Sequence, residues 1–269
     1  MSEFSVSSES YSEHKEAENN PANFRVAIFG TGSEQSESDV KAIKYATESA
    51  RKMIEQGYSI STGGYDKGVM KAATNSAYEA AKQNGIEDTN KIIKAFPFTE
   101  NIAAGEKVRG AEISESTTLI ERLKHLIDES NAFIVLGGKV GTVIELITAI
   151  HSESVQQMKK EKPSPRPTII IDPELEHLNT LNQLVGNDER LSKMAGLKHT
   201  YIIGDTNNWL ENIDIILNLY NRQNNGEELN NEEREFLNQS NYLENLNHWL
   251  INTAKNQRNA ATWPPGRGL

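Results

Sequence analysis

The fold is decided by the stretch from Arg122 to Glu145, which reads Arg-Leu-Lys-His-Leu-Ile-Asp-Glu-Ser-Asn-Ala-Phe-Ile-Val-Leu-Gly-Gly-Lys-Val-Gly-Thr-Val-Ile-Glu. The end of an amphipathic helix comes first, and the apolar run Ala132–Leu136 follows it. A run this short, rich in Phe, Ile and Val and flanked by helical patterns, is typical of a buried parallel strand. A glycine-rich turn then leads into a second helix. Helix, strand, turn and helix in this order predict an α/β protein.

The glycine-rich turn is a predicted phosphate site, made of Gly137, Gly138, Gly141 and Thr142. Backbone N–H groups in such a turn converge on one point, where the helix dipole favours an anion. Glu145 lies one turn further along the helix on nearly the same face, so we expect it to act on a neighbouring sugar hydroxyl or water. The alternative is an ordinary strand-to-helix junction, because an early-helix glutamate also suits the dipole.

Composition narrows the classes of function. The chain has 269 residues, 36% of them hydrophobic, no cysteine and a formal net charge of −10. Disulfides, thiolate metal sites and cysteine nucleophiles are therefore excluded, and the acidic balance disfavours nucleic-acid partners. No apolar stretch approaches the ~20 residues of a membrane span, and no signal-peptide pattern opens the sequence. We expect a cytoplasmic protein with no membrane partner.

Strand and helix patterns alternate along the chain. Short apolar runs end near residues 29, 61, 96, 136, 172 and 205, and helical patterns separate them. This alternation predicts a doubly wound parallel sheet of Rossmann-like α/β class over residues 24–222. The stretch 99–114 has no clear period and is expected to be a loop, whereas residues 159–167 are charged and proline-rich and are expected to be a solvated linker.

Two further glycine turns follow predicted strands. Gly30, Gly32 and Ser33 follow the first strand, and Gly63 and Gly64 follow the second. Ligands of open α/β sheets bind at the carboxyl ends of strands, so the repetition favours a binding site. The dinucleotide fingerprint is incomplete, because its third glycine position holds Gln35, and NAD binding is disfavoured.

The ends of the chain have a different composition. Residues 1–23 are rich in Ser, Glu and Asn and predict a mobile leader. A polar break near residue 223 precedes an amphipathic pattern, which predicts a C-terminal helical extension over residues 223–256. Residues 257–269 are expected to be a mobile tail.

The glycine turns, together with Arg122 standing eight residues before the strand start Ser130-Asn131-Ala132-Phe133, resemble the LOG (Lonely Guy, "lysine decarboxylase-like") family of Rossmann-fold nucleotide proteins. The resemblance spans roughly residues 25–205. That family carries a Pro-Gly-Gly-x-Gly-Thr-x-x-Glu motif, and Gly141, Thr142 and Glu145 keep its spacing. Leu136 replaces the motif's proline, Leu123 replaces a polar residue after the arginine, and Lys139-Val140 puts two residues where the family has one.

The resemblance implies hydrolysis of the N-glycosidic bond of a nucleoside 5′-monophosphate, without a metal or another cofactor. Loss of a base passes through an oxocarbenium-like state, which the Glu145 carboxylate could stabilise while it orients or deprotonates water. Arg122 would hold the sugar phosphate or offset charge in the pocket. The alternative, motivated by the altered turn, is a non-catalytic carrier or sensor that binds a nucleotide-derived ligand, in which Lys139 meets an extra phosphate or carboxylate. The base is not determined.

The resemblance also implies a homodimer. The helix over residues 142–159 has an apolar face expected at Val143, Ile147 and Ile150, with Ile144 and Leu146 outside it. One sheet-packing stripe needs fewer apolar residues than this. The alternative is that the C-terminal helix folds back and covers the surplus within one chain.

Overall fold

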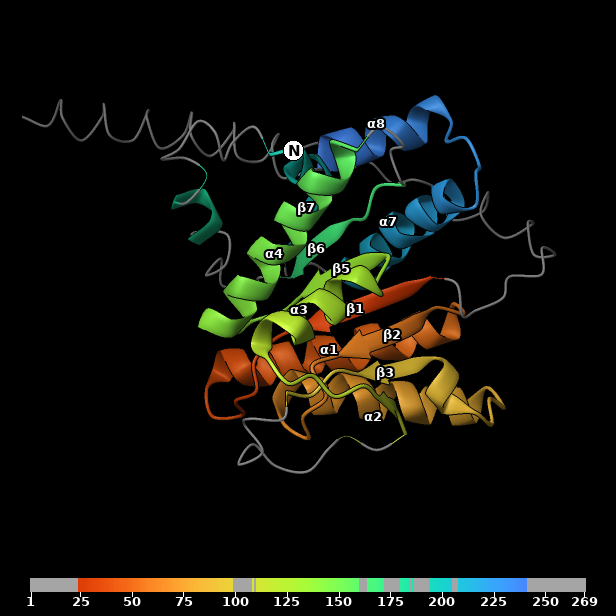
Figure 1. Ribbon diagram of the computed structural model, residues 1–269. Helices are drawn as coiled ribbons and strands as arrows, with labels where there is room; N and C mark the ends of the chain where they lie inside the picture. Colours follow the sequence, from red (N-terminus) through yellow and green to blue (C-terminus); the bar gives the residue numbers. More distant parts are fainter. Residues whose placement is uncertain are drawn as a thin grey trace, which may run out of the picture.

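The structure is a computed structural model that describes residues 24–98, 108, 110–159, 164–171, 180–183, 185, 194–204 and 208–240. Within these ranges, seven strands form one sheet in the order β4-β3-β2-β1-β5-β6-β7 (Figure 1), and every neighbouring pair is parallel. The strands are β1 (Arg25–Phe29), β2 (Ser59–Thr62), β3 (Ile93–Ala95), β4 (Glu112–Ile113), β5 (Ala132–Val135), β6 (Thr168–Ile171) and β7 (Thr200–Ile203). The predicted doubly wound, Rossmann-like sheet is confirmed.

Helices cover both faces of this sheet (Figure 1). One face packs against α1 (Glu37–Glu55), α2 (Gly68–Gln83) and α7 (Trp209–Asn224). The other face packs against α3 (Leu119–Asp128) and α4 (Val140–Gln157). Short 3₁₀ helices, η3 (Thr89–Lys91) and η5 (Ala195–His199), precede β3 and β7.

The central strand β1 shows why its sequence is almost wholly apolar. Val26 and Ile28 belong to the core under α1 and α2, whereas Ala27 and Phe29 belong to the core under α3 and α4. Successive side chains of a strand point to opposite faces, so a strand buried on both faces has no polar alternation. The chain runs outward from β1 through β2 and β3 to β4, and then returns to β5 on the other side of β1. This reversal places a topological switch point between β1 and β5.

The starts of α1 and α3 are fixed by local hydrogen bonds. Ser36 caps α1: its hydroxyl accepts the Asp39 N–H at 3.1 Å, while the Asp39 carboxylate accepts the Ser36 N–H at 3.0 Å. The N-cap of α3 is Thr118, whose hydroxyl accepts the Glu121 N–H at 3.1 Å. The sequence alone predicts Ser116 or Thr117 as this cap, and that prediction is wrong. Three consecutive hydroxyl residues compete for the role, and the last of them, Thr118, has the capping geometry.

Two segments differ from expectation. Strand β4 lies in a stretch expected to be a loop, because two residues at a sheet edge are too few to show a period. Arg166, expected on a solvated linker, is buried. The sequence of this stretch also suggests Lys107 and Arg109 as possible anion contacts, and both lie outside the described residues.

Helix α4 presents a different buried face from the one expected. Leu146, Ala149 and Ile150 are buried against the sheet, while Ile144 and Ile147 are exposed. The expected stripe was therefore wrong for Ile147 and Leu146. The choice depends on the angle at which the helix lies on the sheet, which the sequence period alone does not fix.

Beyond α7, a helix α8 (Asn231–Ser240) packs Leu237 into the core next to α7. Arg222 of α7 and Glu233 of α8 form an ion pair at 2.6 Å. The leader 1–23, residues 241–256 of the predicted extension and the tail 257–269 lie outside the described residues, and those boundaries remain predictions. Within the ranges given above, no helix is long and apolar enough to cross a membrane.

Candidate functional site

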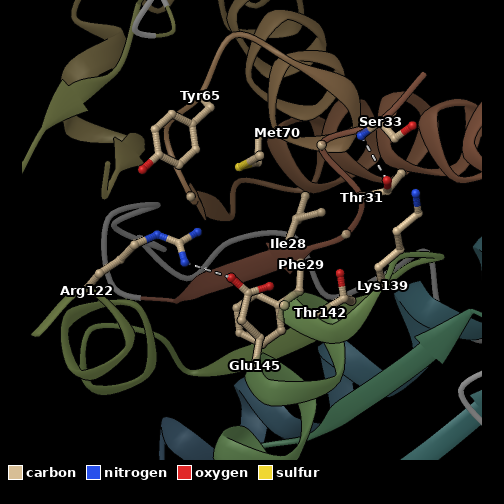
Figure 2. Close-up of a pocket in the computed structure, with 14 residues that line it drawn as sticks. Ile28, Phe29, Thr31, Ser33, Tyr65, Met70, Arg122, Lys139, Thr142 and Glu145 are labelled. Carbon is tan, nitrogen blue, oxygen red and sulfur yellow. Dashed lines mark hydrogen bonds and ion pairs between the residues drawn. The ribbon is translucent and has the colours of Figure 1, made fainter. Parts of the chain in front are cut away.

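A cavity of about 270 Å³ lies at the carboxyl ends of β1, β2 and β5, beside the topological switch point (Figure 2). Ligand pockets in proteins start near this size, at about 300 Å³. The residues around it come from the turns after these strands and from the adjoining helices, and they are Ile28, Phe29, Gly30, Thr31, Gly32, Ser33, Gly63, Tyr65, Met70, Arg122, Lys139, Gly141, Thr142 and Glu145. The three glycine turns are thus brought together at one site.

A backbone hydrogen bond joins the turn after β1 to the turn after β5. The Thr31 N–H donates to the Gly137 carbonyl at 2.8 Å. A Cβ on Gly138 would overlap the Thr142 hydroxyl and would lie 3.1 Å from the Thr31 nitrogen. Gly137 and Gly138 therefore shape the two turns and are absent from the cavity wall, whereas Gly141 lines it.

The remaining predicted glycines allow close approaches. A Cβ on Gly30 would lie 2.7 Å from Val69 of α2. A Cβ on Gly63 would overlap the Arg122 guanidinium, so this glycine admits the arginine to the site. Gly64 has φ +83°, a left-handed conformation that favours glycine. Gly30, Gly32, Ser33 and Gly63 line the cavity, and Gly64 holds the turn behind it.

The amino end of α4 offers unpaired hydrogen-bond donors to the cavity. Lys139 is its N-cap, and no acidic residue occupies its first turn. The first N–H groups of a helix have no acceptor within the helix, and those of Gly141 and Thr142 lie at the cavity. The Thr142 side chain is only 4% exposed, its hydroxyl faces the cavity (Figure 2), and it has no hydrogen-bond partner in the part of the chain that the structure describes. An anion at this point would satisfy these groups.

A buried ion pair lies beside these donors. Arg122 Nη1 is 3.1 Å from Glu145 Oε1, and Arg122 Nε donates to the Phe96 carbonyl at 3.0 Å. Burial raises the pKa of the Glu145 carboxyl, and the Arg122 charge opposes this increase. The pairing places a carboxylate next to the anion position while neutralising its charge, so an incoming phosphate meets less repulsion.

Sequence reasoning missed part of the site. Tyr65 and Met70 line the cavity opposite α4, and the Tyr65 hydroxyl is fixed by hydrogen bonds with the Phe98 backbone N–H and carbonyl, each 3.0 Å. Thr31 was also not selected. The signal for Tyr65 was its place directly after Gly63 and Gly64 at a strand end. No group of three metal-ligating side chains occurs among the residues with described positions.

A family model described as possible lysine decarboxylase matches residues 70–212, more than half of the chain. The chain belongs to this LOG family. The matched region includes Arg122, the turn after β5 and Glu145. No curated protein matches the sequence at a significant level.

Several solved structures are similar to this LOG chain at low sequence identity. The molybdenum cofactor binding protein of Rippkaea orientalis has 19% identity and a TM-score of 0.49, covering 72% of this chain and 97% of its own. The molybdenum cofactor carrier protein of Chlamydomonas reinhardtii has 16% identity and a TM-score of 0.49, covering 72% and 98%. DNA processing protein A of Helicobacter pylori has 16% identity and a TM-score of 0.40, covering 76% and 82%.

Proposed function

We propose that this LOG protein binds a phosphate-bearing, nucleotide-derived small molecule in the cavity beside α4, as a carrier or sensor does. The observation that carries the proposal is the Thr142 hydroxyl, which has no partner among the described residues and lies next to the first N–H groups of α4. Of the lining residues, two are cationic, Arg122 and Lys139, and one is acidic, Glu145. The cavity wall is therefore net positive in a protein whose net charge is −10, which favours an anionic ligand over a neutral one.

The positions of the side chains suggest how the ligand lies. Lys139 and Ser33 are at one end of the cavity and Tyr65 is at the other, with Glu145 and Arg122 along the intervening wall (Figure 2). A phosphate at Thr142 would place a sugar near Glu145 and a flat ring near Tyr65 and Met70. Aromatic and thioether side chains suit a planar ring.

The position of Glu145 favours a second candidate function, hydrolysis of the N-glycosidic bond of a nucleoside 5′-monophosphate. Glu145 would accept a proton from a water that attacks the anomeric carbon, the bond to the base would break, and the base would leave with a proton from solvent. Arg122 would hold the carboxylate ionised and oriented. The ion pair also fits a pure binding site, because it neutralises a buried carboxylate without any chemistry, so binding is the primary proposal and turnover is tested separately.

Phosphate binding is tested with Thr142→Val and a matched control. Thr148 lies on the same helix, but its hydroxyl is already used, donating to the Ile144 carbonyl at 2.7 Å. Calorimetric titration with a nucleoside 5′-monophosphate should show affinity about tenfold or more weaker in Thr142→Val, the scale of a hydrogen bond to a charged group. Thr148→Val should match the wild type. Equal affinity of Thr142→Val and Thr148→Val for the monophosphate would contradict binding of the phosphate at the α4 amino end.

A further inference from the structure

We propose that Lys139 makes the site selective for ligands that carry two linked phosphates, with the second phosphate at the outer end of the cavity. This inference rests on the proposed binding of a phosphate at Thr142 and adds a second anion position to it. The ligand class is a diphosphate, whether free or part of a nucleotide.

The first observation is that Lys139 has no partner among the described residues. Its side chain lines the cavity, and it makes no ion pair or side-chain hydrogen bond within the described ranges. The nearby Lys71 differs, because its ammonium group is 3.5 Å from Asp66. An unpaired ammonium at the mouth of a cavity that already holds free backbone donors adds a charge-assisted contact for any anion bound there.

The acidic residue best placed to neutralise the site is engaged elsewhere. Glu34, in the turn after β1, accepts the Gly68 N–H at 3.0 Å at the amino end of α2. This carboxylate therefore satisfies the amino end of α2, and the amino end of α4 is left for a ligand. Glu145, the acidic residue of the cavity wall, is neutralised by Arg122 at the inner end. At the outer end, the Asp39 carboxylate is held by the Gln35 and Ser36 N–H groups and lies outside the cavity wall. The charged residue of the wall at this end is Lys139.

A further backbone donor, the Gly32 N–H, faces this outer end. The Gly32 N–H makes no backbone hydrogen bond among the described residues, and both Gly32 and Ser33 line the cavity. Lys139 and Ser33 lie on the same side of it (Figure 2). Because the two turns are joined by the hydrogen bond from Thr31 to Gly137 at 2.8 Å, their donors form one surface. The Ser33 N–H already donates to the Thr31 hydroxyl at 2.9 Å. One phosphate can therefore occupy the α4 amino end while the next meets the Gly32 N–H and Lys139.

The test uses inorganic phosphate and pyrophosphate, which need no knowledge of the base. Affinities are measured by calorimetric competition for the wild type, Lys139→Ala, Lys139→Arg and Lys67→Ala. Lys67 is a matched control, since it is also an exposed helix N-cap lysine but lies outside the cavity wall. We expect the wild type to prefer pyrophosphate by about tenfold, equivalent to about 1.4 kcal/mol, and the preference to weaken with salt. Lys139→Ala should lose most of the preference for pyrophosphate, while Lys139→Arg and Lys67→Ala should keep this preference.

The outcomes separate this inference from the proposed function. An unchanged pyrophosphate preference in Lys139→Ala, with phosphate binding still weakened by Thr142→Val, overturns the role of Lys139 and leaves the phosphate site standing. No binding of either anion by the wild type overturns both. Melting temperatures equal to that of the wild type establish that the lysine variants are folded.

Discussion

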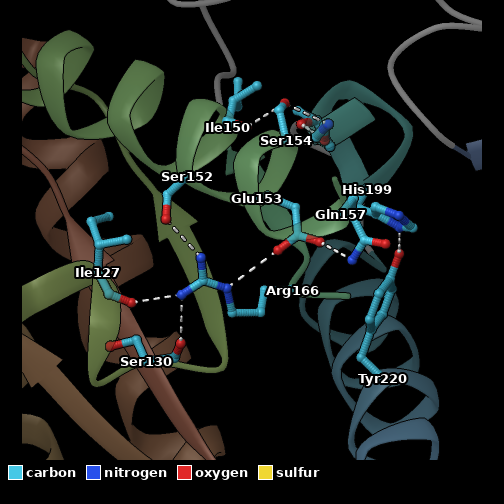
Figure 3. A network of polar contacts seen from close by, with 12 residues as sticks. Ile127, Ser130, Ile150, Ser152, Glu153, Ser154, Gln157, Arg166, His199 and Tyr220 are labelled. Carbon is cyan, nitrogen blue, oxygen red and sulfur yellow. Dashed lines mark hydrogen bonds and ion pairs between the residues drawn. The ribbon is translucent and has the colours of Figure 1, made fainter. Parts of the chain in front are cut away.

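Two glutamates of helix α4 each form a buried ion pair with an arginine from another segment. The two pairs look alike but differ in their surroundings. Glu145, near the amino end of the helix, is 3.1 Å from Arg122. Glu153, about two turns further, is 3.2 Å from Arg166 (Figure 3). The first pair lies at the carboxyl edge of the sheet, in the wall of the cavity. The second lies near the amino edge, where β6 begins, away from it.

The guanidinium of the Arg166 pair is surrounded by hydrogen-bond acceptors of the protein. The guanidinium donates to the Ile127 carbonyl at 2.8 Å, the Ser130 carbonyl at 3.4 Å and the Ser152 hydroxyl at 2.9 Å, and it lies over the Phe133 ring. Charges taken out of water are tolerated when their hydrogen-bonding capacity is met. This network joins α3, α4, β5 and the start of β6.

The carboxylates of the two pairs show the same contrast. Glu153 is 1% exposed and also accepts a hydrogen bond from Gln157 at 2.7 Å. For Glu145, Arg122 is the one hydrogen-bonding partner within the described ranges, and its side chain borders open space. An ion pair whose hydrogen bonds are all made within the protein stabilises the fold. An ion pair that borders a cavity keeps carboxylate and guanidinium atoms available for a ligand. Burial and ion pairing alone do not distinguish a structural pair from a functional one.

The largest expected effect is on stability. Glu153→Gln leaves Arg166 buried without its counter-ion and should lower the free energy of unfolding by about 3–5 kcal/mol. Glu145→Gln should cost clearly less, because cavity water can reach Arg122. Urea denaturation of both variants measures the difference. A larger loss for Glu145→Gln than for Glu153→Gln would reverse the assignment of the two pairs.

The next effect concerns turnover, should the protein hydrolyse nucleotides. Glu145→Gln should lower base release by ~100-fold or more, the scale of a positioned acid or base, while binding of the monophosphate stays close to that of the wild type. Because burial raises the pKa of Glu145 and the reaction needs the carboxylate, the wild-type rate should fall with decreasing pH at a value above that of an ordinary glutamate. An undiminished rate in the variant would exclude Glu145 from the chemistry.

A buried histidine should make stability depend on pH. Burial, and then the charge of Lys198, lowers the pKa of His199 to about 4, and its Nδ1 is 2.7 Å from the Tyr220 hydroxyl. Between the unfolded pKa near 6.5 and pH 4 the unfolded chain binds more protons, so stability falls as pH falls, by about 3 kcal/mol in all. His199→Gln should flatten this part of the stability curve. The same slope in both proteins would assign it to other groups.

The smallest expected effect on stability comes from a change in oligomeric state. We propose that the protein forms a homodimer through the outer face of α4. Val140 and Met158 are each 74% exposed, and Ile144, Ile147 and Val155 lie between them at helical spacing. An unpartnered apolar stripe of this length is typical of an interface. Ile144→Glu should give a monomer by light scattering, with the folded state retained.

A chain ending near Asn224 tests the alternative covering helix. If the full chain is monomeric and dimerises only when truncated, the C-terminal segment covers the stripe and the dimer proposal is wrong. A dimer in both forms supports the interface on α4.

The sequence predicted the sheet and the glycine turns because both depend on local patterns. Apolar runs mark strands buried on both faces, and glycines at strand ends mark close approaches such as Gly138 against Thr142. Arg166 was placed on a solvated linker because its partner Glu153 lies on another element, and no local pattern records that contact. Tyr65 was missed for the same reason, since its position depends on Phe98 in a neighbouring segment.

The most direct test of the account is one calorimetric comparison of nucleoside 5′-monophosphates with the corresponding nucleosides, with free base quantified in the same samples. Since the phosphate contributes most of the binding at the α4 amino end, the monophosphates should bind at least about tenfold more tightly than the nucleosides. Binding without free base supports the carrier or sensor function, and binding with free base supports hydrolysis. Equal affinity for phosphorylated and unphosphorylated forms would contradict the phosphate site on which both functions depend.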